Sequence, residues 1–397
     1  MTLRPSSSHH HLVLSRPRGL GRRLWPAAAA VTAGALVAMT LAASGASAAP
    51  GCSGCGYTQI NMVSNQTGDA PLTDPDLVNA WGLSASPGTN SAPGSPLWVS
   101  DNGTDVTTLY SGATATTVNK VALTVSIPSG APTGQVFNSD SNPNDFVVTD
   151  SAGHSGRAVF LFDTEAGSIA GWNPGVGTTP PPSTVAEEPV TNFANAVYKG
   201  LAIAQASDGN TYLYAANFRS GRVEVYNSKF MPVQLPGGLF LDPKIPAGYA
   251  PFNVQELAGQ LYVTYAKQDA TQHDDVAGQG HGFVDVFTND GALVRRLVTR
   301  GQLNSPWGLA LAPADFGQFS GDLLVGNFGD GHINVYDPNN GARLVELRQA
   351  NGQPIVIDGL WGLRFGNGNA AKTNELLFSA GPDDESNGLL GKIVANS

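Results

Sequence analysis

Short, mostly apolar runs of four to eight residues recur along the chain between residues 57 and 397. The runs are rich in β-branched and aromatic side chains, and they end at Gly, Asn, Asp or Pro. This pattern predicts β-strands joined by tight turns. Because no segment shows a 3.6-residue apolar period over the length of a helix, we predict an all-β fold.

One motif recurs six times along this region. Trp-Gly-Leu stands at residues 81–83, 307–309 and 361–363, and related triplets stand at residues 134–136, 200–202 and 253–255. The equivalent residues of successive triplets, 82, 134, 200, 253, 308 and 362, are 52, 66, 53, 55 and 54 positions apart. An aliphatic run, a Gly-rich turn and a run ending in an aromatic residue follow most triplets. Four strands in each of six units predict a six-bladed β-propeller.

The second unit is the longest of the six. We assign residues 146–149 to its second strand and residues 158–162 to its third. The stretch from residue 172 to residue 189, which contains three consecutive prolines, is then an inserted loop.

The two ends of the repeat region predict how the ring closes. The last unit has room for only three strands, whereas residues 57–64 form a lone strand before the first unit. We predict that this strand is the fourth strand of the last blade, which leaves no long sheet edge exposed. Two β-sandwiches joined near residues 178–188 are the alternative, but they would not explain equal spacings on both sides of the joint.

Five segments of the chain carry a family resemblance: Asn79 to Leu83, Ala216 to Phe218, Pro306 to Leu309, Gly326 to Phe328 and Gly331 to Tyr336. They resemble NHL-type six-bladed propellers, and more closely an uncharacterised family of secreted bacterial propeller proteins. The resemblance implies the propeller fold over the mature chain. It implies no activity, because propellers host enzymes, binding proteins and scaffolds alike.

Residues 1–48 have the order of a secretory signal peptide. Five arginines and no acidic residue precede an Ala-rich apolar run, and Ala46-Ser47-Ala48 supplies a cleavage site. We predict a secreted, extracellular protein that is exported from a bacterium by the Sec or the twin-arginine route, since Arg22-Arg23 leaves both open. The alternative is a membrane anchor, but an apolar run of about 17 residues is marginal for a span. We expect no transmembrane segment in the mature chain.

Residues 49–56 form a short segment ahead of the predicted propeller, and they contain both cysteines. Cys52 and Cys55 form a C-x-x-C motif directly after the predicted cleavage site. Because the predicted compartment is oxidising, we expect a local disulfide. A redox pair and half of a zinc site are the alternatives.

The charge balance excludes one class of partner. The chain has 21 Lys and Arg against 31 Asp and Glu, a net charge of −10, and removal of residues 1–48 with their five arginines leaves −15. Non-specific nucleic-acid binding needs a basic face, so we predict no nucleic-acid partner. We expect a monomer.

Acidic residues gather in the turns that we place between second and third strands, which share one face of a propeller with the channel mouth. These turns hold ten of the 31 acids and cover residues 101–105, 150–157, 216–222, 266–282, 327–331 and 380–388. Carboxylate and amide oxygens suit Ca²⁺ or Mg²⁺. Asn102, Asn217 and Asn327 stand at equivalent places and are candidate ligand-binding residues. The alternative is that Asn recurs because it tolerates the backbone of tight turns.

The longest of these turns, residues 266–282, carries the candidate chemistry. Asp269, His273, Asp274 and Asp275 are candidate metal ligands, and His273 and Asp275 are the catalytic candidates, with His273 as a general base. A solvated polar loop is the alternative.

Three tryptophans begin predicted inner strands. Trp81, Trp307 and Trp361 are candidate ligand-binding residues that would offer an aromatic platform near the mouth. Packing between blades is the alternative.

Three functions remain open. The first is binding of a small molecule, glycan or peptide on the acidic face, with or without a divalent cation. The second is a metal-dependent, lactonase-like hydrolase or lyase at the same face. The third is a scaffold for a protein partner.

Overall fold

The computed structural model describes residues 56–89, 92–112 and 118–396. The chain divides into two units, residues 1–50 and 51–397, and every described residue belongs to the second. The predicted signal peptide and the pair Cys52 and Cys55 lie outside the described residues. No helix in the described part of the chain is long and apolar enough to cross a membrane.

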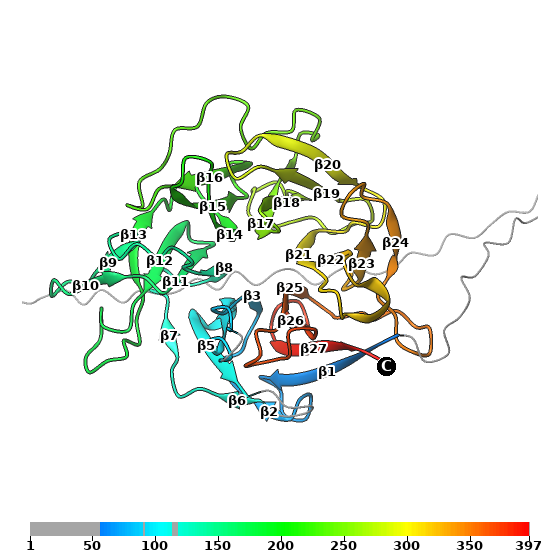
Figure 1. The fold of residues 1–397 in the computed structure, drawn as a ribbon, viewed down its shortest axis with the longest axis horizontal. Helices are drawn as coiled ribbons and strands as arrows, with labels where there is room; N and C mark the ends of the chain where they lie inside the picture. The colour runs from blue at the N-terminus through cyan, green and yellow to red at the C-terminus, as the bar shows by residue number, and fades with distance from the viewer. Residues whose placement is uncertain (1–55, 90–91, 113–117, 397) are drawn as a thin grey trace, which may run out of the picture. The chain divides into compact units, whose positions relative to one another are not determined.

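The second unit is a six-bladed β-propeller, as predicted (Figure 1). In the first three blades the strands run outward from the axis as β3 (Ala80–Ser84), β4 (Leu97–Asp101), β5 (Val106–Ser111) and β6 (Asn119–Lys120), with β7 (Val125–Ser126) also on β5; β8 (Pro132–Phe137), β11 (Phe160–Thr164), β12 (Ser168–Trp172) and β13 (Glu187–Thr191); and β14 (Tyr198–Gln205), β15 (Thr211–Asn217) and β16 (Arg222–Tyr226).

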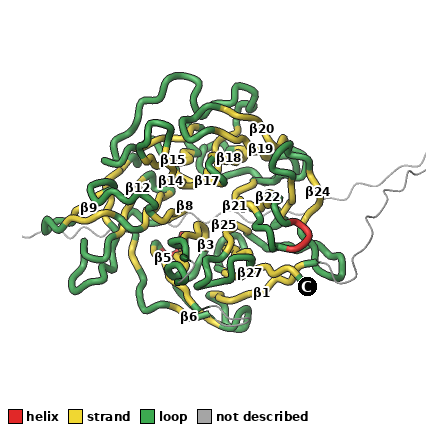
Figure 2. The backbone as a smooth tube through the Cα atoms, viewed as in Figure 1, coloured by secondary structure: helices red, strands yellow, loops and turns green. Residues whose placement is uncertain are grey.

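In the other three blades the order is β17 (Tyr249–Leu257), β18 (Gln260–Lys267), β19 (Gly282–Phe287) and β20 (Leu293–Thr299); β21 (Pro306–Leu311), β22 (Leu323–Asn327), β23 (Ile333–Tyr336) and β24 (Arg343–Glu346); and β25 (Leu360–Phe365), β26 (Leu376–Ala380), β27 (Leu389–Ala395), β1 (Tyr57–Ser64) and β2 (Leu72–Thr73). Two short 3-10 helices, η1 (Asn102–Thr104) and η2 (Gly317–Phe319), lie in turns. Figure 2 shows how much of the remainder is loop.

The ring closes as the sequence predicts. Strand β1 pairs antiparallel with β27, from Tyr57 opposite Ala395 to Ser64 opposite Leu389. The first and last strands of the propeller, β1 and β27, therefore lie side by side in one blade, and the edges that face each other are hydrogen-bonded.

Apolar side chains on both faces of each blade hold the ring together. A separate buried cluster lies between every pair of neighbouring blades. Successive side chains of a strand point to opposite faces, so Leu201 packs toward the second blade and Ala202 toward the fourth. This arrangement explains why the strands are apolar on both faces.

Crowding around the axis explains the repeated Gly of the sequence motif. A Cβ atom at Gly308 would lie 2.6 Å from Trp361 O in the next blade, and one at Gly362 would lie 2.6 Å from Trp81 O. Gly82, Gly134 and Gly200 likewise leave less than 3.0 Å to the following inner strand. In the fourth blade Asn253 takes this position, and its Nδ2 donates to Trp307 O at 2.8 Å.

The predicted strand assignment of the second blade is wrong. Residues 147–149 form β9 (Val147–Thr149), which pairs only with β10 (Ser155–Arg157) in a separate hairpin at the outer edge of the ring (Figure 1). The second strand is instead β11. The error arose because β9 and β11 are equally apolar runs, and periodicity alone does not show which of two such runs joins the blade.

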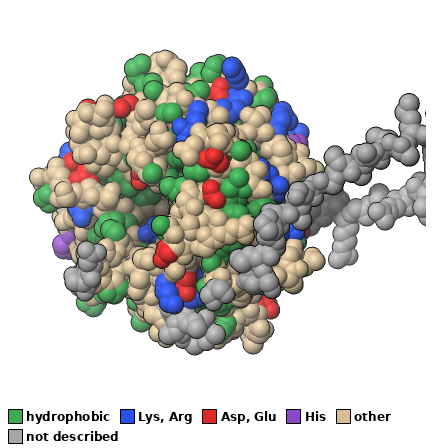
Figure 3. Space-filling view, turned by 45° about the vertical axis from the view of Figure 1, so that its right-hand side comes forward, with side chains coloured by type: hydrophobic (Ala, Val, Ile, Leu, Met, Phe, Trp, Pro, Cys, Tyr) green, Lys and Arg blue, Asp and Glu red, His purple; other side chains and the backbone are tan. Residues whose placement is uncertain are grey.

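The surface carries few charges for its size. On the face shown in Figure 3, Lys and Arg side chains are interspersed with Asp and Glu, and most of the surface is uncharged. The structure shows no continuous basic face in this view, in keeping with the acidic composition.

Candidate functional site

Equivalent residues stand near the start of each inner strand, one position before the crowded Gly or, in the fourth blade, before Asn253. Three blades have Trp there, and the others have Thr, Lys and Phe; in chain order the six residues are Trp81, Thr133, Lys199, Phe252, Trp307 and Trp361. This ring of six residues is the floor of the candidate site.

Aromatic side chains close the channel at this level. The rings of Trp81 and Trp361 stack with centroids 3.4 Å apart, and Trp307 meets both edge-on at 5.9 Å. Phe328 stacks on the other side of Trp361 at 3.8 Å. All three tryptophans are at least 95% buried. The predicted aromatic residues thus lie together, as a buried plug and not as an exposed platform.

Lys199 stands at the position where three other blades have Trp, and its side chain places a buried charge at the mouth. Its Nζ forms an ion pair with Glu165 Oε1, lies 3.6 Å from Asp274 Oδ1 and lies 5.2 Å from the centroid of the Trp81 ring. Burial by itself lowers the pKa of Lys199, but the charge and hydrogen bond of Glu165 act together with the charges of Asp274 and Asp275, and the pKa is raised. The ammonium group therefore stays charged.

Glu165 stands in the turn between β11 and β12, and a chain of hydrogen bonds links it to two other blades. Its Oε2 accepts from Asn102 Nδ2 at 2.9 Å, and Asn102 Oδ1 accepts from Asn79 Nδ2 at 3.1 Å. Asn79 Nδ2 also donates to Glu385 Oε2 at 2.8 Å, while Asn79 Oδ1 accepts from Trp361 Nε1. The network joins the carboxylates of the mouth to the aromatic plug.

Glu385 reaches this network from a strained turn. Three consecutive residues, Asp383, Asp384 and Glu385, have φ values of 56°, 52° and 64°. Residues with a Cβ rarely adopt this left-handed backbone conformation, and such backbone strain often marks functional sites. Burial, and then the nearby charge of Glu165, raises the pKa of Glu385.

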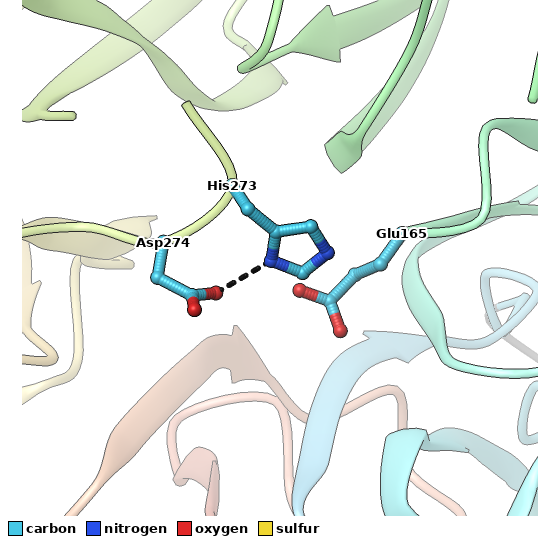
Figure 4. Close-up of side chains that lie close together, drawn as sticks. All are labelled: Glu165, His273 and Asp274. Atoms are coloured by element: carbon cyan, nitrogen blue, oxygen red, sulfur yellow. Dashed lines mark hydrogen bonds and ion pairs between the residues drawn. The ribbon is translucent and has the colours of Figure 1, made fainter. Parts of the chain in front are cut away.

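The loop between β18 and β19 folds over the mouth and adds a histidine. His273 Nδ1 lies 2.8 Å from Asp274 Oδ1, and one ligand atom each from Glu165, His273 and Asp274 lie within 4.8 Å of one another (Figure 4). The hydrogen bond to Asp274 raises the pKa of His273, and the same bond lowers the pKa of Asp274 to about 2. At neutral pH the pair is thus a carboxylate beside a readily protonated imidazole.

Two further predicted metal ligands of this loop are not members of that trio. Asp269 Oδ1 accepts from the backbone N–H of Thr271 and of His273, so it shapes the turn. Asp275 is largely enclosed, and burial raises its pKa, opposed by Ser305 and Lys199.

The three equivalent asparagines differ in role. Asn102 belongs to the mouth network described above. Asn217 bonds within its own blade, to Glu224 and to Asn195 O, and Asn327 Nδ2 bonds to Asp330 and to Gln302 O. The last two thus stabilise turns, as the alternative explanation of the repeat holds.

The turn at residues 150–157, predicted at the mouth, is instead part of the β9–β10 hairpin. Asp150 accepts from His154 and from the backbone N–H of Gly177. The corrected blade places Glu165 in the equivalent turn.

Sequence reasoning missed the two central residues, Glu165 and Lys199. A signal for Lys199 was present, because it stands directly before Gly200, at the place that Trp81 occupies before Gly82. Glu165 lacked such a signal as long as residues 146–149 were assigned to the second strand.

No family model matches the chain. It is 33% identical over 338 residues to Uncharacterized protein R648 of Acanthamoeba polyphaga mimivirus, covering 84% of this chain and 78% of that protein. Uncharacterized protein L690 of the same virus is 34% identical over 344 residues, covering 84% of each chain. The bacterial and secreted character of the family stays a prediction.

Solved structures show weaker similarity. Virginiamycin B lyase from Staphylococcus aureus is 11% identical, with a TM-score of 0.41, 86% of this chain covered and 99% of that one. The Penicillium chrysogenum α-L-arabinanase complexed with arabinobiose is 11% identical, with a TM-score of 0.49, 85% of this chain covered and 98% of that one. Similarity at this level carries no conclusion about activity. The two viral proteins, in contrast, are 33% and 34% identical to this chain over 84% of its length. The chain belongs to the family of uncharacterised proteins that includes R648 and L690 of the mimivirus.

Proposed function

We propose that the channel mouth binds a small, uncharged molecule that carries several hydroxyl groups, such as a sugar unit of a glycan. The observation that carries the proposal is the convergence of Glu165, Lys199, His273 and Glu385, from four segments of the chain, above a closed aromatic floor. A hydroxyl group both donates and accepts, and here carboxylate acceptors stand beside ammonium and imidazole donors. Anionic ligands are disfavoured, because carboxylates outnumber cations at this mouth.

The site is organised before a ligand arrives. Glu165 is held on one oxygen by Lys199 and on the other by Asn102, and His273 is oriented by Asp274. Groups fixed in this way lose little conformational freedom on binding, which favours affinity.

Histidine NMR tests this proposal. Imidazole-labelled protein is titrated with D-glucose, D-galactose, D-mannose and D-xylose, and we expect a saturable shift of the His273 signal with at least one sugar. The signal is assigned with His273→Gln. His281 is the matched control, since it lies in the same loop with its Nδ1 2.7 Å from Val276 O. A shift confined to His281, or no shift with any sugar, would contradict the proposal.

A metal-dependent hydrolase or lyase is the second candidate, and one observation favours it. Glu165, His273 and Asp274 can each offer a ligand atom to one ion, and the imidazole with two carboxylates is a set that suits a transition metal better than Ca²⁺ or Mg²⁺. Lys199 opposes this candidate, because its ammonium group already neutralises Glu165 and repels a cation near Asp274.

Calorimetric titration with Zn²⁺, Mn²⁺, Ca²⁺ and Mg²⁺ separates the two candidates. Under the sugar-binding proposal Lys199 acts in place of a metal, and no ion binds stoichiometrically below about millimolar concentration. Tight binding of one ion that Glu165→Gln abolishes would favour the metal-dependent candidate instead.

A further inference from the structure

The third blade has only three strands within the described part of the chain, whereas each of the other five blades has at least four. Its sheet ends at β16 (Figure 1). The loop after β16 begins a fourth strand and then turns away. Asn227 N–H donates to Met231 O at 3.0 Å. Val233 N–H donates to Val225 O at 2.8 Å, and the pairing stops there. The edge of β16 is therefore covered only from Val225 onward.

Val223 presents two unused backbone groups on the open part of this edge. In an antiparallel strand the N–H and C=O groups of alternate residues point to the same side, so those of Val223 point outward as those of Val225 do. Neither outward group of Val223 makes a hydrogen bond among the described residues. Ile333 is the equivalent residue of the fifth blade, and there Leu347 N–H donates to Ile333 O at 2.8 Å. The third blade thus leaves open an edge that the fifth blade covers with its own chain.

A groove of about 640 Å³ lies along this edge, and its volume is within the range of ligand sites. Residues 189–192 of the second blade, residues 222–226, Phe230 and residues 232–235 line it. Val190 belongs to the buried cluster on the side of the second blade, whereas Val233 and Leu235 pack against the cluster on the side of the fourth blade. Because the groove has a wall on each side of β16, a single extended chain fits it more readily than the rim of a second propeller.

The side chains around the groove favour an apolar segment that carries one acidic residue. Phe193 and Met231, which are 55% and 60% exposed, are each next in sequence to a lining residue. Arg222 is exposed, and no salt bridge among the described residues includes its guanidinium group. Glu224 turns its carboxylate elsewhere, since its Oε1 accepts from Asn217 Nδ2 at 2.7 Å. The guanidinium group of Arg222 is therefore free to bind a carboxylate.

We propose that the groove beside β16 binds an extended peptide as the fourth strand of the third blade. One peptide residue lies opposite Val223, donates its N–H to Val223 O and accepts from Val223 N–H. The next peptide residue lies opposite Arg222 and is acidic, and the preceding one is apolar and faces Val190 and Phe230. Addition of a strand to an open sheet edge is a common mode of peptide recognition. This site is separate from the channel mouth, because Glu165, Lys199, His273 and Glu385 do not line the groove.

Fluorescence anisotropy with the labelled, amidated peptide Thr-Ile-Val-Glu-Thr tests the proposal. The valine of this peptide takes the place opposite Val223, and its glutamate takes the place opposite Arg222. We expect saturable binding of one peptide per chain below about millimolar concentration. Methylation of the valine nitrogen removes one backbone donor but no side chain, and it should weaken binding about tenfold. No saturable binding, or equal affinity of the two peptides, would overturn the proposal.

Two protein variants locate the binding. Val223→Pro removes a backbone N–H that no described residue uses, and proline is tolerated on an edge strand where its nitrogen faces outward. We expect it to weaken peptide binding about tenfold. Arg222→Glu should weaken binding about fivefold, whereas Lys372→Glu, the same change at an exposed residue of the sixth blade, should leave it unchanged. If Val223→Pro fails to fold, Arg222→Glu still decides, since binding as tight as in Lys372→Glu would contradict the proposal.

Sedimentation velocity separates a peptide from a second copy of this chain as the occupant of the edge. We expect the unaltered protein and Val223→Pro to sediment alike, with no dependence of their mass on concentration. A dimer that forms with rising concentration and that Val223→Pro abolishes would assign the edge to a second copy and overturn the proposal.

Discussion

The two halves of the channel ring differ at a single equivalent position. The first, fifth and sixth blades place Trp81, Trp307 and Trp361 there, and these side chains stack into a plug. The second, third and fourth blades place Thr133, Lys199 and Phe252 there. Thr133 and Lys199 bond to carboxylates, whereas Phe252 packs against Trp361 of the plug. The inner strands of both halves pack closely in the same way. The comparison teaches that the repeated backbone packing forms the ring of inner strands. The one side chain at the equivalent position of each blade determines whether that blade closes the channel or holds a carboxylate.

Removing the central Trp of the plug should have the largest effect on stability. Trp361 touches four other aromatic rings and is almost completely buried. We expect Trp361→Ala to lower the free energy of unfolding by about 4 kcal/mol, measured by urea denaturation. Phe193→Ala, at a side chain that is 55% exposed, is the control and should change it by less than about 0.5 kcal/mol. Equal effects would contradict the plug.

Removing the charge from the other half of the ring should cost somewhat less. Lys199→Met keeps the length of the side chain but leaves Glu165, which is only 15% exposed, without its cation. We expect a loss of about 3 kcal/mol in the free energy of unfolding. Adding Glu165→Gln should restore most of it, because the unpaired charge is then gone. A double variant as unstable as Lys199→Met would show that the ion pair is not the cause.

The close packing of Gly against the next blade is common to both halves. We therefore expect its loss to lower the free energy of unfolding by the same, smaller amount in each half. Gly134→Ala in the second blade and Gly308→Ala in the fifth both force a Cβ against the backbone of the next blade. We expect each to lower the free energy of unfolding by about 2 kcal/mol. Gly237→Ala is the matched control, since no atom lies within 4 Å of an added Cβ there. A large difference between the first two variants would show that the halves pack differently.

The pH dependence of the mouth should be the smallest effect. The pKa of His273 is raised by its bond to Asp274, so its stabilising contribution is full below about pH 6.5, the unfolded value, and is lost as pH rises through the folded pKa. The pKa of Asp274 is lowered to about 2, so its contribution is present above about pH 4 and is lost as pH falls. The pair therefore favours folding between about pH 4 and 6.5.

An NMR titration of His273 checks this directly. Asp274→Asn should lower the pKa of His273 toward its ordinary value. The signal of His332, which lies near Asp330 on another blade, is the control and should be the same in both proteins. An unchanged His273 would show that Asp274 does not set its pKa.

Most of the fold could be predicted from the sequence, because the repeat includes positions where only a residue without a Cβ fits against the backbone of the next blade. Gly308 and Gly362 recur since a Cβ would strike the next blade, and the strand at residues 57–64 was required to complete the last blade. The second blade failed because two apolar runs competed for one place. Secretion, the disulfide of Cys52 and Cys55, and the monomeric state remain predictions.

The candidate site could be predicted only in part. His273 and Asp274 were found because their loop is long and rich in acids and histidines. Glu165 and Lys199 were missed because their partnership depends on which turns meet at the axis. A single Lys among aligned tryptophans is informative only once the ring geometry places it beside a carboxylate.

The most direct test of the proposed mouth is calorimetric titration of the four neutral sugars into two proteins. These are the wild-type chain and the double variant Lys199→Met with Glu165→Gln, which removes both charges while retaining the folded core. The account predicts saturable binding of at least one sugar to the wild-type chain and at least tenfold weaker binding to the variant. No binding to either protein, or equal binding to both, would contradict it.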